Sequence, residues 1–100
     1  MLGLCISPEA EADLDEIWLH LAKESRSVGT ADRFLDRLSS LFSRLARNPY
    51  LGRRRDDLRL TYRSIPLGRY VVIYRVAEDR DVSVLRVVHG ARDISTLVAE

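Results

Sequence analysis

The sequence predicts an α+β fold: a short N-terminal strand, an antiparallel helical hairpin, a three-stranded antiparallel meander and a short C-terminal segment. Two observations predict it. Apolar residues recur at helical spacing through the first half of the chain, and three apolar runs separated by turn residues follow in the second half. One hundred residues suffice for one hydrophobic core, so we expect residues 1–100 to form a single domain.

The chain opens with a short apolar run, Leu2 to Ile6, which lacks helical spacing and predicts a brief strand. Ser7 is a suitable N-cap and Pro8 suits the first position of a helix, which we expect to end near Glu24. The apolar stripe of this helix consists of Ala10, Leu14, Ile17, Trp18 and Leu21.

A second helix is predicted after the break from Ser25 to Gly29, with Thr30 as the candidate cap. Asn48-Pro49 ends it. Its stripe consists of Phe34, Leu35, Leu38, Leu41, Phe42 and Leu45. Because the connection is short, the two helices should pack as an antiparallel hairpin.

After a polar loop from Tyr50 to Arg59, three runs predict the strands of a meander: Leu60 to Ile65, Tyr70 to Val76 and Val82 to His89. The middle run, YVVIYRV, is apolar at nearly every position, as expected of a central strand covered on both faces. The hairpin covers only one face. We therefore expect the other face either to be solvated by Tyr70, Tyr74 and Arg side chains or to be reserved for a partner.

Composition limits the classes of function. Sixteen basic and 15 acidic residues give a net charge of +1, so bulk charge does not predict direct nucleic-acid binding. The single cysteine, Cys5, cannot form an intrachain disulfide, and no run is apolar enough for a signal peptide or a bilayer-spanning helix. We expect a cytoplasmic protein without membrane attachment.

The sequence lacks the residues that most kinds of catalytic, metal or cofactor site require. One cysteine and two histidines do not predict a metal site, and no glycine-rich loop predicts a nucleotide cofactor. What remains is a set of cations on and after the predicted strands: Arg63, Arg69, Arg75, Arg86 and Arg92. They would hold a phosphate in an RNA-cleaving site, hold the acidic tail of a partner, or extend to solvent.

The segment after the last strand allows two interpretations. His89 is either a strand-end imidazole bonded to backbone or a proton-transfer residue, and Arg92 with Asp93 forms either a local ion pair or part of a site.

Four segments in order carry a family resemblance: SPEAEADLDEIW, LARNPYLGRRR, LRLTYRSIPLGRYVVIYRV and VLRVVHGARD. Together they resemble the ParE branch of the RelE/ParE toxins. The resemblance implies the toxin of a bacterial type II toxin–antitoxin system, neutralised in a hetero-oligomer by a ParD-like antitoxin. ParE-like toxins act on DNA gyrase, whereas RelE-like relatives cut messenger RNA on the ribosome.

The tail favours the gyrase inhibitor. After Arg92 it reads DISTLVAE and offers no Tyr, His, Lys or Arg for acid–base chemistry, so we expect toxicity by binding rather than catalysis. Candidate toxicity residues are His89, Arg92 and Asp93. The alternatives are a ribonuclease that uses Arg63, His89 and Arg92, and a non-toxic relative that only binds its antitoxin.

An antitoxin tail can fold on contact, laying an amphipathic helix along the hairpin and adding a strand to the sheet. Candidate contacts are Trp18, Leu19 and Leu21 on the first helix. Arg63, Arg75 and Arg86 are expected to face the carboxylates of that tail. Leu19 lies off the apolar stripe, and a partner would explain its exposure.

Overall fold

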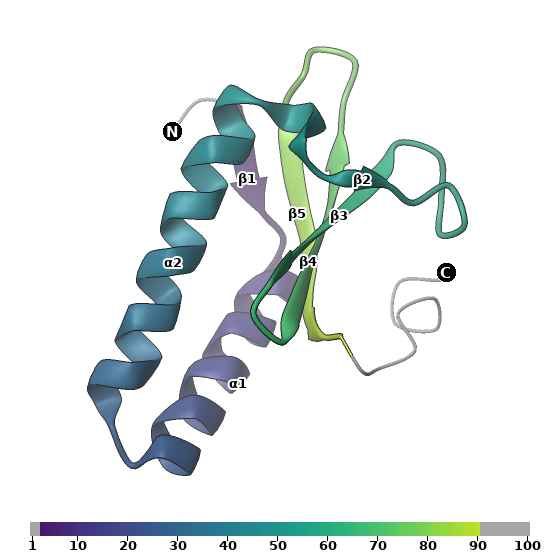
Figure 1. Cartoon of the computed structure of the whole chain (residues 1–100). Coiled ribbons are helices and arrows are strands. Elements are labelled where there is room, and N and C mark those ends of the chain that lie inside the picture. Colours follow the sequence, from purple (N-terminus) through teal and green to yellow (C-terminus); the bar gives the residue numbers. More distant parts are fainter. Residues whose placement is uncertain (1–2, 91–100) are drawn as a thin grey trace.

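The computed structural model describes residues 3–90, which fold into one twisted sheet with two helices on one side of it (Figure 1). The helices and strands are β1 (Leu4–Ile6), α1 (Pro8–Ser25), α2 (Val28–Arg47), η1 (Pro49–Leu51), β2 (Arg53–Arg54), β3 (Tyr62–Leu67), β4 (Tyr70–Val76) and β5 (Val82–His89). The predicted α+β fold is therefore confirmed. Neither helix is long and apolar enough to cross a membrane in the part of the chain described.

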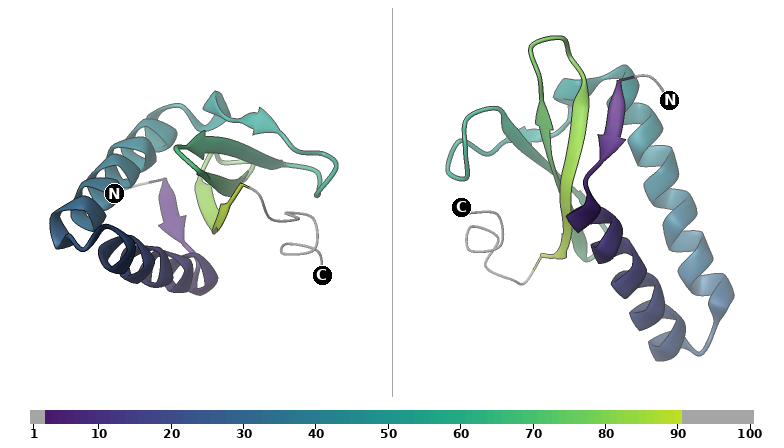
Figure 2. Two further views of the ribbon diagram at one scale, coloured as in Figure 1. Left: turned by 60° about the horizontal axis from the view of Figure 1, so that its bottom comes forward. Right: turned by 180° about the vertical axis from the view of Figure 1, so that it is seen from behind.

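The strands lie in the order β1-β5-β4-β3-β2. The antiparallel meander of β3, β4 and β5 was predicted. Strand β1 was predicted as a strand, but its parallel pairing with β5, with Leu4 opposite Val82, was not. The short β2 was not predicted; it pairs antiparallel with β3 inside the predicted loop. Figure 2 shows the two helices side by side against one face of this sheet.

The start of α2 corrects the predicted cap. Ser27, not Thr30, is the N-cap, and its Oγ accepts a hydrogen bond of 3.2 Å from the backbone N–H of Thr30. Arg26, at φ 57°, turns the chain after α1. The connection is shorter than the Ser25–Gly29 break suggested because Val28 and Gly29 are already helical.

The first strand of the meander is displaced from the prediction, since it begins at Tyr62 rather than Leu60 and continues to Leu67. Pro66 lies within it, opposite Val71. In a two-residue hairpin the backbone of Leu67 is hydrogen-bonded to β4, whereas the backbone nitrogen of Pro66 points away from β4. Strand β2 does not extend to that position, so the missing N–H of Pro66 costs no hydrogen bond of the sheet. Gly68, at φ 61°, supplies the left-handed residue of the turn.

The core lies between the sheet and the helices. Its largest fully buried side chain is Tyr74, which is 0% exposed, and Tyr70 packs on Phe34 with 5.1 Å between ring centroids. Both tyrosines therefore face the helices, and the prediction that they solvate the opposite face is wrong. That face instead buries Ile73 and Val88, and four partly buried side chains pack against them: Leu58, Tyr62, Val71 and Leu85.

Tyr74 also ties η1 and β2 to the sheet. Its hydroxyl donates to the carbonyl of Pro49 at 2.9 Å and accepts from the N–H of Gly52 at 2.7 Å. Burial raises the pKa of Tyr74. A Cβ on Gly52 would lie 2.5 Å from this hydroxyl and 2.8 Å from the carbonyl oxygen of Ser64, so this approach requires glycine.

Candidate functional site

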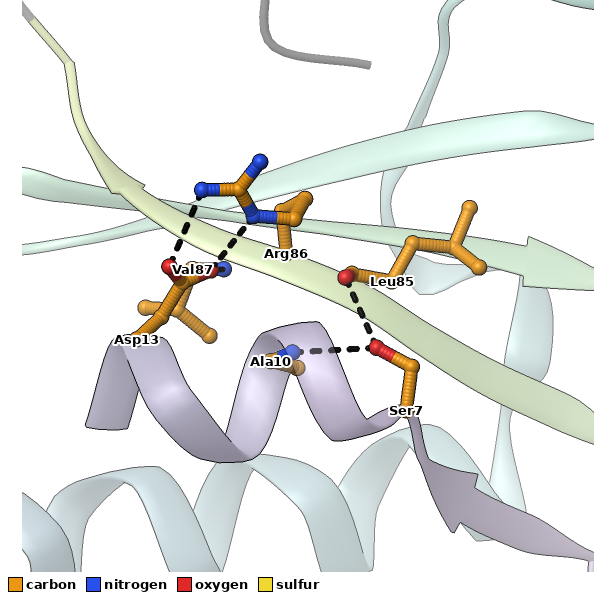
Figure 3. A network of polar contacts seen from close by, with 6 residues as sticks. All are labelled: Ser7, Ala10, Asp13, Leu85, Arg86 and Val87. Atoms are coloured by element: carbon orange, nitrogen blue, oxygen red, sulfur yellow. Dashed lines mark hydrogen bonds and ion pairs between the residues drawn. The ribbon is translucent and has the colours of Figure 1, made fainter. Parts of the chain in front are cut away.

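The outer edge of β5 is joined to α1 through side chains (Figure 3). The Oγ of Ser7 donates to the carbonyl of Leu85 at 2.9 Å, while it accepts from the N–H of Ala10 at 3.0 Å. The carboxylate of Asp13 accepts from the N–H of Val87 at 2.9 Å and from Arg86 Nε and Nη2 at 2.7 and 3.0 Å. The carboxylate of Asp13 therefore binds both the backbone of β5 and the guanidinium of Arg86.

A β-bulge brings Arg86 to this position. Ile73 of β4 pairs with Arg86, but Tyr74 pairs with Val84, so Leu85 is an extra residue in β5. The Asp13 hydrogen bonds raise the pKa of Arg86, although burial acts in the opposite direction. Arg86 was expected to face the carboxylates of an antitoxin, and the structure gives it a carboxylate of its own chain.

The outer side of the helical pair carries an apolar groove of about 560 Å³. We call it the hairpin groove; it is lined by Glu11, Leu14, Asp15, Trp18, Leu19 and Leu35. Leu19 is 52% exposed, and Trp18 Nε1 donates to Asp32 Oδ1 at 2.9 Å, which fixes the indole between the helices. Of the predicted antitoxin contacts, Trp18 and Leu19 meet here.

Leu21 lies elsewhere. It is partly buried against the main core rather than in the hairpin groove. The sequence analysis assigned Leu14 and Leu35 only to the apolar stripes, yet both line the groove as well. Their positions at the margins of the two stripes were the available signal.

A second hollow, of about 570 Å³, lies at the end of the sheet where the β4–β5 turn is found. We call it the sheet-end cleft; its lining includes Tyr50, Arg54, Leu60, Thr61, Arg63 and Arg75. Arg63 Nη1 donates to the carbonyl of Gly52 at 2.7 Å, and its guanidinium lies 5.1 Å from the Tyr50 ring centroid. Arg63 and Arg75, expected to face a partner's carboxylates, both line this cleft, but Arg63 lies opposite Tyr74 and Arg75 opposite Tyr62, so their side chains leave opposite faces of the sheet.

A family model described as the ParE toxin of the type II toxin–antitoxin system parDE matches residues 4–94. The chain belongs to the ParE toxin family. It is 35% identical to Toxin ParE1 of Mycobacterium tuberculosis over 89 residues, which cover 89% of this chain and 90% of that toxin. It is also 35% identical to Toxin ParE3 of Caulobacter vibrioides over 83 residues, covering 83% and 81% of the two chains.

A solved structure of the chromosomal ParDE toxin–antitoxin system of P. aeruginosa superimposes with a TM-score of 0.73. The match covers 89% of this chain and 96% of that one, at 21% sequence identity. It shows that this ParE toxin shares the fold of that structure.

Two of the three residues of the alternative ribonuclease site, Arg63 and His89, lie far apart in this ParE chain. Arg63 lies opposite Tyr74, and His89 lies opposite Tyr70, so they meet β4 four positions apart, about 13 Å along the strand. Arg92 and Asp93 lie outside the described residues. The structure therefore does not bring Arg63 and His89 into one site.

The two histidines of the ParE chain lie on different elements, α1 and β5, and meet at one pocket. His20 and His89 line the same pocket, and the rings of His89 and Tyr70 are 5.5 Å apart, edge to face. Burial, followed by the charge of Glu24, raises the pKa of Tyr70. Between residues 3 and 90 we find no cluster of three or more His, Cys, Asp or Glu side chains able to hold a metal ion.

Proposed function

We propose that this ParE toxin inhibits DNA gyrase by binding, without catalysis, and so blocks replication and growth until a ParD-like antitoxin neutralises it. The observation that carries the proposal is the family match over residues 4–94, supported by two relatives named as ParE toxins. Gyrase as target would place the protein in the cytoplasm.

The separation of candidate catalytic groups supports binding over catalysis. RNA cleavage by a protein requires a base, an acid and a phosphate-stabilising cation within hydrogen-bond reach of one nucleotide. Arg63 and His89 are too far apart for that arrangement within the described residues. His89, Arg92 and Asp93 stay our candidates for toxicity through contact with the target, and the ribonuclease and the non-toxic relative are the alternatives that experiment must exclude.

The target is tested by inducing the gene in bacteria. We expect filamentation and a DNA-damage response while translation continues. Arg92→Ala should reduce toxicity at least about tenfold, the loss expected when a central charged contact is removed. Arg47→Ala, a change at an exposed position of α2, is the matched control.

Early cleavage of transcripts with a block in translation and no DNA damage would contradict the gyrase proposal. A folded, soluble product without any effect on growth would point to the non-toxic relative. Equal toxicity of the two arginine variants would remove Arg92 from the candidate site.

For the antitoxin we propose the hairpin groove as the main contact, through Trp18 and Leu19. The apolar walls of the groove fit the apolar face of a helix, and Glu11 and Asp15 on its rim favour basic residues beside that face. Contact of Arg63, Arg75 and Arg86 with acidic residues of the same antitoxin stays a prediction.

Leu19→Glu is expected to weaken antitoxin binding at least about tenfold, because it places a negative charge between the apolar walls of the groove, whose rim already carries two carboxylates. The measurement is isothermal titration calorimetry with the antitoxin encoded beside the toxin gene. Val28→Glu is the matched control, since Val28 is 56% exposed and lies outside the groove. Equal affinities for the two variants would show that the antitoxin does not use the groove.

A further inference from the structure

A pocket of about 390 Å³ lies where the β3–β4 turn approaches both helices. We call it the turn pocket; its lining includes His20, Glu24, Arg37, Arg69, Tyr70 and His89. These residues come from α1, α2, the β3–β4 turn, β4 and β5. The volume lies in the range of about 300–1,000 Å³ that is typical of small-ligand sites. Because five parts of the chain line it, the pocket suits a compact ligand better than an extended chain.

Two arginines from different elements bring positive charge to this pocket. Nη1 of Arg37 lies 4.0 Å from the position that a Cβ on Gly68 would occupy, so its guanidinium is beside the turn that carries Arg69. Both arginines are exposed, and neither side chain makes a hydrogen bond or an ion pair within the described range 3–90. Glu24, the acidic residue of the lining, has its Oε1 3.6 Å from Nε2 of His20. An incoming anion would therefore gain two guanidiniums that give up no partner.

Hydroxyl groups in the lining favour a phosphate as that anion. Burial raises the pKa of Tyr70, the charge of Glu24 acts in the same direction and Arg69 opposes both, so the phenol is protonated at neutral pH and can donate. Thr30 Oγ1 accepts from Arg33 Nη2 at 3.2 Å, which leaves the hydroxyl proton of Thr30 available. Phosphate oxygens bind arginine and hydroxyl donors of this kind. A phosphate monoester presents three acceptor oxygens to them, one more than a carboxylate.

The rings in the lining indicate what the phosphate is attached to. His20 and His89 are exposed, and they line both this pocket and the one beside Arg86. The Tyr70 ring is supported by Phe34 at 5.1 Å and meets His89 at 5.5 Å between ring centroids. Nucleobases stack on tyrosine and histidine rings. The lining therefore fits a nucleoside phosphate better than inorganic phosphate.

We infer that the turn pocket binds a nucleoside monophosphate, whose phosphate lies between Arg37 and Arg69. The base lies against the imidazole rings of His20 and His89. The phosphate belongs either to a free nucleotide or to the end of a nucleic acid strand, since both are monoesters. This goes beyond the proposed function, because inhibition of gyrase by binding requires no small ligand and the turn pocket shares no lining residue with the hairpin groove.

The test titrates the full chain, isotopically labelled for NMR, with adenosine 5′-monophosphate. We expect shifts of the amides of Gly68, Arg69 and Tyr70, which all line the pocket. Arg37→Glu and Arg69→Glu should each weaken binding at least about tenfold. Arg44→Glu, the same charge reversal on α2 outside the pocket, should bind as the unchanged protein does. Arg37→Gln repeats the test if the charge reversal disturbs folding.

Comparison of ligands at the same amides decides the outcome. Adenosine, which lacks the phosphate, and inorganic phosphate, which lacks the nucleoside, should each bind at least about tenfold more weakly than the nucleotide. Equal affinity of either compound would overturn the inference, and so would equal affinity of Arg37→Glu and Arg44→Glu for the nucleotide. The absence of shifts at about 10 mM nucleotide, a tenfold excess over a millimolar dissociation constant, would overturn it as well.

Single-stranded oligoadenylate, with and without a 5′-phosphate, identifies the source of the phosphate. Tighter binding of the phosphorylated strand than of the nucleotide would assign the pocket to a strand end, and tighter binding of the nucleotide would assign it to the free compound. Both results support a phosphate between Arg37 and Arg69. A strand without the phosphate that binds at these amides as tightly as the nucleotide would overturn the inference.

Discussion

Replacing Tyr74 by alanine is expected to lower the free energy of unfolding by about 3–5 kcal/mol, the cost of deleting a large aromatic side chain from a core. Tyr74 is 0% exposed and carries the hydroxyl that joins η1 and β2 to β4. The loss is measured by urea denaturation, provided that the m-value is unchanged. A loss below about 1 kcal/mol would contradict the packing described.

The variant Tyr74→Phe measures the contribution of the hydroxyl group to stability separately from that of the ring. The expected loss is about 1–3 kcal/mol, because the Gly52 N–H and the Pro49 carbonyl lose their partner. Tyr62→Phe is the matched control, expected to change stability by less than about 0.5 kcal/mol. Equal stability of the two variants would show that the hydroxyl bridge contributes nothing.

The same residue predicts sensitivity to alkali. Burial raises the pKa of Tyr74 above the ordinary tyrosine value of 10.0, so the unfolded chain ionises first as the pH rises. The stability is therefore fully present below pH 10 and falls above it, as ionisation stabilises the unfolded state. Tyr74→Phe should show a smaller fall over this range.

Replacing Asp13 by alanine is expected to lower the free energy of unfolding by about 3 kcal/mol. Asp13 and Arg86 have side chains only 13% and 24% exposed, so the change leaves a largely buried guanidinium without its carboxylate. It also leaves the N–H of Val87 without its acceptor. Glu16→Ala, on the same helix, is the matched control, with an expected change below about 0.5 kcal/mol.

The double variant Asp13→Ala/Arg86→Met tests the cause. Removing both charges should be less destabilising than removing Asp13 alone, because no largely buried guanidinium then lacks the Asp13 carboxylate. A double variant that loses the full sum of the two single losses would show that the residues act independently.

The element types were predictable from local signals, whereas their registers were not. Ser7 and Pro8 mark the start of α1 because caps act within one turn. The run Tyr70 to Val76 identifies β4. Because both faces of this strand carry apolar residues, the sequence does not indicate which face meets the helices, and Tyr70 and Tyr74 were placed on the wrong one. The parallel pairing of β1 with β5 joins residues 78 apart, for which the sequence has no local signal.

The distance along the chain decides which neighbours in a candidate site can be predicted from the sequence. Trp18 and Leu19 are adjacent in the chain, and the apolar Leu19 beside the stripe of the same helix was a signal that the sequence alone contains. The contact between Asp13 and Arg86 joins residues 73 positions apart and depends on the bulge at Leu85, which no pattern in the sequence predicts. The stacking of Arg80 on Tyr50 likewise requires the β4–β5 turn to return beside η1.

The side-chain contacts along β5 also bear on self-association. An exposed strand edge is a template on which another chain can build, leading to swapped dimers or fibres. Ser7 and Asp13 occupy the hydrogen-bonding positions at Leu85 and Val87 that such a chain would need. Ser7 and helix α1 therefore protect the part of β5 that β1 leaves unpaired, so that among the described residues the sheet ends at two very short strands, the three-residue β1 and the two-residue β2.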